Sequence, residues 1–189
     1  MYKKFIMMIF ILLMMSACTN NETLDTGYLD VSQEDISTIY KPVDKTTAKK
    51  ALPYDIKSPS YFPFEHEQTK VVISGWENSK ENIVSFIQYP STEEDAKWQE
   101  GSISQPAIPH ISYTIANFDR YYSRYSNTGD YIDVDINDDI TGLFKMNKAI
   151  KGAELHWFNG EMEYNLQLIY FSDDRDKLKT ELLKIANSI

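Results

Sequence analysis

The strongest constraint on the fold is an alternating stretch at residues 151–171, KGAELHWFNGEMEYNLQLIYF, centred on Asn159-Gly160. An Asn-Gly pair between alternating segments strongly predicts a β-hairpin, because a type I′ turn needs positive φ at both central residues. A two-residue loop would pair Phe158 with Glu161 and His156 with Glu163, and it gives each strand an apolar and a polar face. The predicted apolar face carries Ala153, Leu155, Trp157, Met162, Tyr164, Leu166 and Leu168. The polar face carries Glu154, His156, Glu161, Glu163, Asn165 and Gln167, with Phe158 as its one large apolar residue.

Other segments predict further strands of the same sheet. KVVISGW at 70–76 and NIVSFIQY at 82–89 flank a polar loop and indicate a second hairpin. Residues 110–118 and 140–146 have similar compositions. Residues 131–136 alternate strictly, which is typical of a half-exposed strand. One face of that strand would carry Tyr131, Asp133 and Asp135, and the other Ile132, Val134 and Ile136.

Two helices complete the predicted fold. A short one at 44–52 would begin at the N-cap Asp44 and end before Pro53. A longer one at 172–188 would begin at the N-cap Ser172 and bury the stripe Leu178, Leu182, Ile185, Ala186 and Ile189. We expect it to cover the sheet face that carries Trp157 and Tyr164. The predicted class is therefore α+β: an antiparallel sheet of about six strands, a typical size, with the C-terminal helix on one face and the short helix before it.

The remaining segments suggest a simple domain organisation. Residues 19–30 are polar and without period, which predicts a disordered tether, and 31–40 are ambiguous, although Ser32 could start a short helix there. Residues 91–101 favour a short helix or a loop, and 119–129 are turn-rich. We therefore assign a signal peptide to 1–17, a lipidated cysteine and tether to 18–43, and one domain to 44–189.

The first eighteen residues, MYKKFIMMIFILLMMSAC, predict export. A short positive segment with Lys3 and Lys4 precedes an apolar run at 5–15, which is shorter than the roughly 20 residues of a membrane-spanning helix. The end of the leader, Met15-Ser16-Ala17-Cys18, resembles the lipobox of bacterial lipoproteins, although that pattern prefers Leu at the position of Met15. The resemblance implies cleavage between Ala17 and Cys18 and acylation of Cys18, which would anchor the protein at the extracytoplasmic face of the cell membrane. A short membrane anchor or a buried helix is the alternative.

Charge and cysteine content limit the possible partners. Removal of the leader lowers the formal net charge from −9 to −11, because Lys3 and Lys4 leave with it. Such a surface repels nucleic acid and anionic lipid headgroups, so the membrane contact would come through acylated Cys18. Cys18 is the only cysteine, which excludes an intramolecular disulfide.

Four short segments carry a second resemblance. They are ALPY at 51–54, PSYFP at 59–63, LHW at 155–157 and LKIANS at 183–188. Their order resembles a Gram-positive envelope domain of unknown function that is also found in extracytoplasmic parts of anti-sigma-factor proteins. Some of these domains are similar to half-barrel lipoprotein carriers, which implies a curved antiparallel sheet with helices on one side. Residues 91–130 lie outside this resemblance, and the family offers no catalytic residues to carry over.

The candidate metal sites are weak by the rules of their chemistry. The acidic run that starts at Asp133 and Asp135 echoes a calcium loop, but such loops need glycine at position six and a bidentate acid at position twelve. Those positions hold Asp138 and Phe144, so a strand and turn explain the run better. Glu65-His66-Glu67 are adjacent and lack the spacing of a zinc site. We therefore expect no metal and no cofactor.

One aromatic cluster could bind a ligand or glycan, or could simply pack on the sheet: Phe118, Tyr121, Tyr122 and Tyr125 with Arg120 and Arg124. No nucleophile elbow or phosphate loop is present. The leading hypothesis is a non-catalytic binding or sensing lipoprotein for an envelope protein or an apolar ligand. An envelope enzyme acting on cell wall or lipid is the first alternative, with its active group among Glu65, His66, His110, Asp133 and Asp135. A lipid or lipoprotein carrier is the second.

Overall fold

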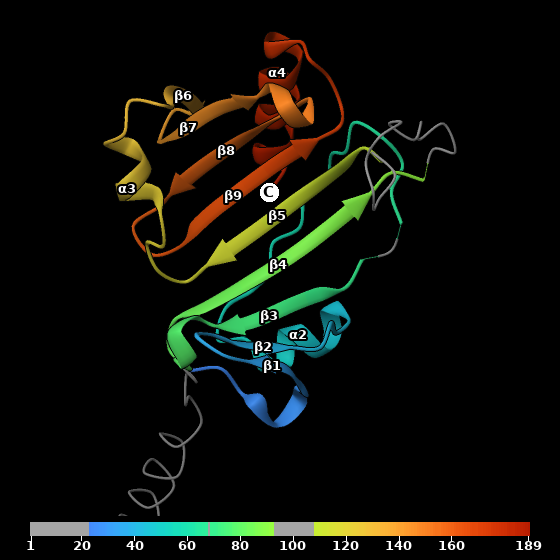
Figure 1. Ribbon diagram of the computed structural model, residues 1–189, viewed down its shortest axis with the longest axis vertical. Helices are drawn as coiled ribbons and strands as arrows, with labels where there is room; N and C mark the ends of the chain where they lie inside the picture. The colour runs from blue at the N-terminus through green and yellow to red at the C-terminus, as the bar shows by residue number, and fades with distance from the viewer. Residues whose placement is uncertain (1–22, 68, 93–107) are drawn as a thin grey trace, which may run out of the picture.

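The computed structural model describes residues 23–67, 69–92 and 108–189. Within these residues one antiparallel sheet has the strand order β1-β2-β3-β4-β5-β9-β8-β7-β6 (Figure 1). Its strands are β1 (Val31–Glu34), β2 (Thr38–Tyr40), β3 (Val71–Gly75), β4 (Ile83–Pro90), β5 (His110–Ala116), β6 (Ile132–Asn137), β7 (Ile140–Asn147), β8 (Gly152–Phe158) and β9 (Glu163–Ile169). The helices are α2 (Lys45–Ala51), α3 (Tyr122–Ser126) and α4 (Arg175–Ala186), with 3-10 turns η1 (Thr26–Tyr28), η2 (Trp76–Asn78) and η3 (Lys148–Ile150).

The expectation of about six strands is wrong, because the described residues form a mostly-sheet protein with nine. The strands that the sequence reading did not indicate are β1 and β2, which have only four and three residues. Strand β1 pairs with β2, and β2 joins the sheet through non-local contacts, because Thr38 opposes Gly75 and Ile39 opposes Ser74. Leu24 is buried, and its amide donates to the carbonyl of Lys80 over 2.8 Å. Residues 24–43 therefore belong to the folded unit rather than to a flexible tether, whereas Cys18 and the predicted leader lie outside the described residues.

One face of the sheet, which we call the covered face, supports the hydrophobic core. Helices α2 and α4 lie behind the sheet in the view of Figure 1, and both contact it there. The predicted stripe of α4 is confirmed in its main part, because Leu178, Leu182, Ile185 and Ala186 are all buried. The predicted N-cap is wrong: Asp174, not Ser172, accepts the amide hydrogens of Asp176 and Lys177, and the helix begins three residues later than expected.

The β8–β9 hairpin forms where predicted, but its turn and register differ from the prediction. Phe158 pairs with Glu163, so the loop has four residues, 159–162, instead of two. The Asn159 side-chain oxygen accepts the amides of Glu161 and Met162, which stabilises the wider loop, and only Gly160 of the Asn-Gly pair has positive φ. The shift moves each pairing by two residues, so it preserves which side chains share a face. His156 consequently lies opposite Asn165 and not opposite Glu163.

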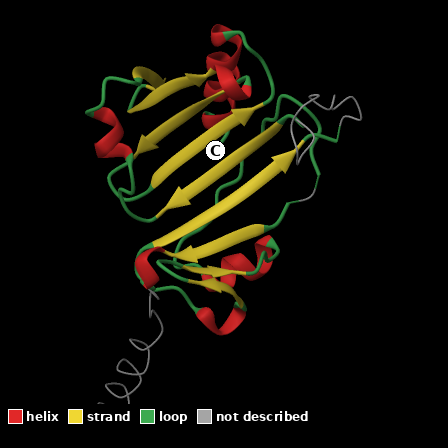
Figure 2. Cartoon of the chain, viewed as in Figure 1, coloured by secondary structure: helices red, strands yellow, loops and turns green. Residues whose placement is uncertain are grey.

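The opposite face of the sheet, which we call the open face, carries α3 near the β8 end (Figure 2). Cross-strand pairing arranges its side chains in rows across β4, β5, β9 and β8. One row consists of Phe86, Thr114, Asn165 and His156, and a second consists of Gln88, Ser112, Gln167 and Glu154. The first row changes from apolar Phe86 on β4 to His156 on β8, and the second row is polar throughout and ends at Glu154 on β8, so the ionisable residues of both rows lie at the β8 end.

Candidate functional site on the open sheet face

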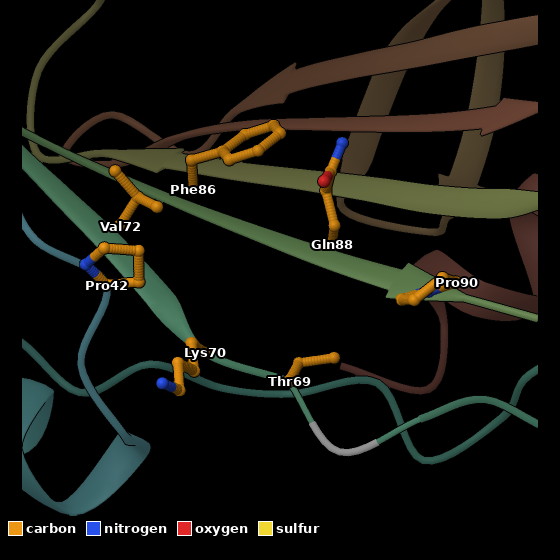
Figure 3. A pocket seen from close by; sticks show the side chains of 7 residues that line it. All are labelled: Pro42, Thr69, Lys70, Val72, Phe86, Gln88 and Pro90. Atoms are coloured by element: carbon orange, nitrogen blue, oxygen red, sulfur yellow. The ribbon is translucent and has the colours of Figure 1, made fainter. Parts of the chain in front are cut away.

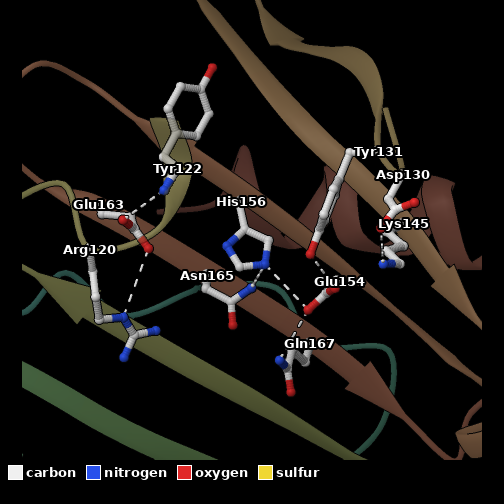
Figure 4. Close-up of polar contacts among 10 residues, drawn as sticks. All are labelled: Arg120, Tyr122, Asp130, Tyr131, Lys145, Glu154, His156, Glu163, Asn165 and Gln167. Atoms are coloured by element: carbon white, nitrogen blue, oxygen red, sulfur yellow. Dashed lines mark hydrogen bonds and ion pairs between the residues drawn. The ribbon is translucent and has the colours of Figure 1, made fainter. Parts of the chain in front are cut away.

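A polar network surrounds His156 at the β8 end of the open face (Figure 4). The Nε2 atom of His156 lies 2.7 Å from the side-chain nitrogen of Asn165 and 3.3 Å from a carboxylate oxygen of Glu154. Glu154 also accepts hydrogen bonds from the Tyr131 hydroxyl at 2.7 Å and the Gln167 amide at 3.3 Å. Side chains from strands β8 and β9 and from the segment before β6 thus meet on one carboxylate.

The rings of Tyr125 and Tyr131 cover this network. Tyr125 of α3 stacks on Tyr131 with a centroid distance of 5.1 Å, and the His156 ring stands edge-on to both. The His156 side chain is only 4 % exposed, and its Nδ1 atom is buried without a hydrogen bond in the described part of the chain. A solute could reach this imidazole only after α3 moved, so the network as it stands is suited to fixing α3 on the sheet rather than to catalysis.

Glu154 is ionised within this network at neutral pH. Its partial burial opposes ionisation, but hydrogen bonds from His156 and Tyr131 outweigh that effect and lower the pKa of Glu154 below its usual value. The Lys145 ammonium, which also pairs with Asp130 at 3.4 Å, acts in the same direction. Burial and the Glu154 carboxylate raise the pKa of Tyr131, so its hydroxyl remains a donor.

A second carboxylate, Glu163, holds the start of α3. It is buried, and its Oε2 atom accepts the backbone amides of Tyr121 at 2.6 Å and Tyr122 at 3.1 Å. Its Oε1 atom lies 4.0 Å from Nε of Arg120, which is beyond hydrogen-bond distance. Glu163 therefore places α3 and faces one cation at the same time.

Aromatic rings hold the Arg120 guanidinium on the open face. Its central carbon lies 4.6 Å from the ring centre of Tyr121 and 5.8 Å from that of Trp76, and these two rings are nearly perpendicular. The Arg120 side chain is 15 % exposed. Stacked guanidinium groups keep their planar donor edge available for a carboxylate or phosphate.

A groove of about 320 Å³ lies at the β3–β4 end of the open face (Figure 3). Pro42, Val72, Phe86 and Pro90 make most of its surface apolar, and Gln88, Lys70 and Thr69 add polar groups. Figure 3 shows the side chains of Val72, Phe86 and Gln88 rising from the same side of the sheet. This mixture of apolar walls and a few polar groups is typical of small-molecule sites.

A groove of about 450 Å³ at the β6–β7 edge is bordered by five charged residues, Asp130, Lys145, Lys148, Asp173 and Arg175, and lacks the mostly apolar walls of the open-face groove. On the covered face, the groove between the hairpin and the end of α4 measures about 190 Å³ and is lined by residues that include Trp157, Tyr164 and Ile189. Ligand pockets usually measure about 300 Å³ or more. The open face is therefore the better candidate for binding.

The structure does not gather the candidate catalytic residues in one place. His66 contacts the backbone oxygen of Glu67 and packs on Phe62 and Tyr89. His110 contacts the carbonyl of Ile108, at the far end of β5 from Glu163. Asp133 and Asp135 lie exposed on β6, at the edge of the sheet, and no cluster of potential metal ligands occurs among the described residues.

The aromatic cluster at 118–125 is partly packed and partly exposed. Tyr121 and Tyr125 stack on each other at 5.5 Å, and Tyr122 lies 6.3 Å from Phe158. The sequence identified this cluster and Arg120, and it placed the partners Glu154, Glu163 and Asn165 on the polar face of the hairpin without indicating their burial. The alternating pattern shows which face these residues share, whereas their burial depends on α3, which is distant in sequence.

A scan against protein-family models and searches of curated proteins and of solved structures gave no match to this chain. None of the described helices is both long and apolar enough to cross a membrane.

Proposed function

We propose that the mature protein is a lipid-anchored binding module at the extracytoplasmic face of the cell membrane, and that the open sheet face is its binding surface. The anchoring part of this proposal rests on the leader and on Cys18, as argued from the sequence.

One observation carries the binding part: the two faces of the sheet differ in what covers them. The covered face is filled by the core, whereas the open face keeps a groove that includes the half-buried Phe86. A fold that needed its sheet only for stability would gain by covering such apolar surface. Exposure of this groove is thus better explained by a ligand than by stability.

Cell fractionation tests the anchoring. Wild-type protein should sediment with membranes, and Cys18→Ala should be released or remain unprocessed. Membrane attachment of Cys18→Ala with an uncut leader would instead indicate a plain anchor and contradict lipidation.

Site-specific photo-crosslinking in intact cells tests the binding surface. A crosslinking amino acid at Phe86 should give a discrete adduct, and the same group at Thr180, on the exposed side of α4, should not. The same adduct from both positions, or none from Phe86, would contradict the choice of face.

A further inference from the structure

The Arg120 guanidinium has donors that the described protein does not use. No hydrogen bond joins it to another described residue, and its buried Nε atom is unpartnered. A guanidinium has five N–H donors, and buried donors in folded proteins are almost always satisfied. A group this well covered therefore indicates an acceptor that comes from outside the chain.

Glu163 does not supply that acceptor. Its Oε2 atom is committed to the amides of Tyr121 and Tyr122, and its Oε1 atom is 4.0 Å from Nε. Figure 4 shows the two terminal nitrogens of Arg120 turned away from Glu163. The side of the guanidinium that could hold an anion in a two-point contact is thus left without a carboxylate.

The surroundings favour an anion with an apolar body. Ala116 pairs with Glu163 on the open face and leaves only a methyl group there. Two residues along β5, Thr114 has a hydroxyl without a hydrogen bond to any described residue, and it pairs with Phe86, which lines the groove. On the open face, the cation and the apolar groove therefore lie on either side of Ala116 and Thr114, which are themselves 2 % and 8 % exposed.

We propose that Arg120 binds the carboxylate of a small amphipathic ligand whose apolar body lies over Phe86 in the groove. This proposal deepens the proposed function and rests on the open face being the binding surface. Local charge complementarity selects the ligand: the guanidinium of Arg120 is a largely covered cation, and arginine matches the two oxygens of a carboxylate.

Titration of ¹⁵N-labelled mature protein with N-acetyl-phenylalanine tests the proposal, and its uncharged amide is the matched control. The acid should bind and shift the Nε–Hε resonance of Arg120, whereas the amide should bind roughly tenfold more weakly or worse, the loss expected for one charge-assisted contact. Equal affinity for the acid and the amide would overturn the proposal. So would binding of the acid that shifts other resonances but leaves the Nε–Hε resonance of Arg120 unmoved.

Variants separate binding from folding. Arg120→Met should lose the preference for the acid, Arg120→Lys should retain part of it, and Arg124→Met, an exposed arginine of α3, should retain all of it. If Arg120→Met unfolds, Arg120→Lys still decides, because a purely structural arginine would leave the preference for the acid unchanged. If a crosslinker at Phe86 gives an adduct but the acid does not bind, the open face is still a binding surface, and the proposal that Arg120 binds a carboxylate is refuted.

Discussion

The two faces of one sheet differ in how their polar and apolar groups are arranged. On the covered face, Leu155, Leu166 and Leu168 pack against α4 in a continuous apolar core. On the open face, alternate residues form two rows across β4, β5, β9 and β8, and the ionisable residues of these rows, His156 and Glu154, both lie on β8. Period-two alternation lets one strand serve stability on one side and recognition on the other.

The largest expected effect on stability comes from truncating a buried side chain on the covered face. Leu166→Ala should lower the free energy of unfolding by about 2–5 kcal/mol, because it removes a fully buried side chain and leaves a cavity. Denaturant titration measures this loss. A loss below about 1 kcal/mol would mean that the covered face is not the main core.

Glu163→Gln should have the next largest effect. It keeps the shape of the side chain but replaces a carboxylate that accepts two α3 amides and faces Arg120, so we expect a loss of about 1–3 kcal/mol. Hydrogen exchange should show faster opening of Tyr121 and Tyr122, whereas α4 should be unaffected. Uniform loosening of both helices would contradict a local role for Glu163.

Asp174→Ala should cost about 1 kcal/mol, because Asp174 caps the first turn of α4. Ser172→Ala is the matched control, since Ser172 accepts only the amide of Asp174 and lies outside the helix. Thermal unfolding of both variants compares them. A larger loss of stability for Ser172→Ala would show that Ser172 is the N-cap, as the sequence suggested.

The smallest of these effects concerns pH. Because the pKa of Glu154 is lowered in the folded state, the unfolded chain binds its proton more readily, and acid favours unfolding. This contribution is complete above the unfolded pKa of Glu154 and is lost as the pH falls through its folded pKa. Glu154→Gln should therefore show a shallower loss of stability between neutral and acidic pH than the wild type, as measured by denaturant titration at each pH. Parallel curves would show that the network does not hold Glu154 ionised.

The sequence predicts local structure well where pattern and burial agree. Alternation in the hairpin assigned Leu155 and Leu166 to the core face correctly, even though the register differs by two residues, because such a shift preserves the faces. The turn type failed because the Asn159 side chain caps a four-residue loop, an interaction that the Asn-Gly pair does not reveal.

Non-local pairing explains the rest of the differences. Strands β1 and β2 have only four and three residues, too few for a clear alternating pattern, and Thr38 and Ile39 join the sheet by pairing with β3. The burial of His156 and Glu163 likewise depends on α3, and the position of Arg120 depends on Trp76, which lies far from it in the sequence. These contacts create the candidate site, and no short-range pattern encodes them.

The central claim is that the covered face stabilises the fold and the open face binds a ligand. The most direct test measures stability and binding in one variant, Phe86→Ser. We predict that it lowers the free energy of unfolding by less than Leu166→Ala does, because Phe86 keeps some exposure whereas Leu166 is fully buried, and that it abolishes N-acetyl-phenylalanine binding. A stability loss as large as that of Leu166→Ala, with binding retained, would show that the open face is a second core and not a binding surface.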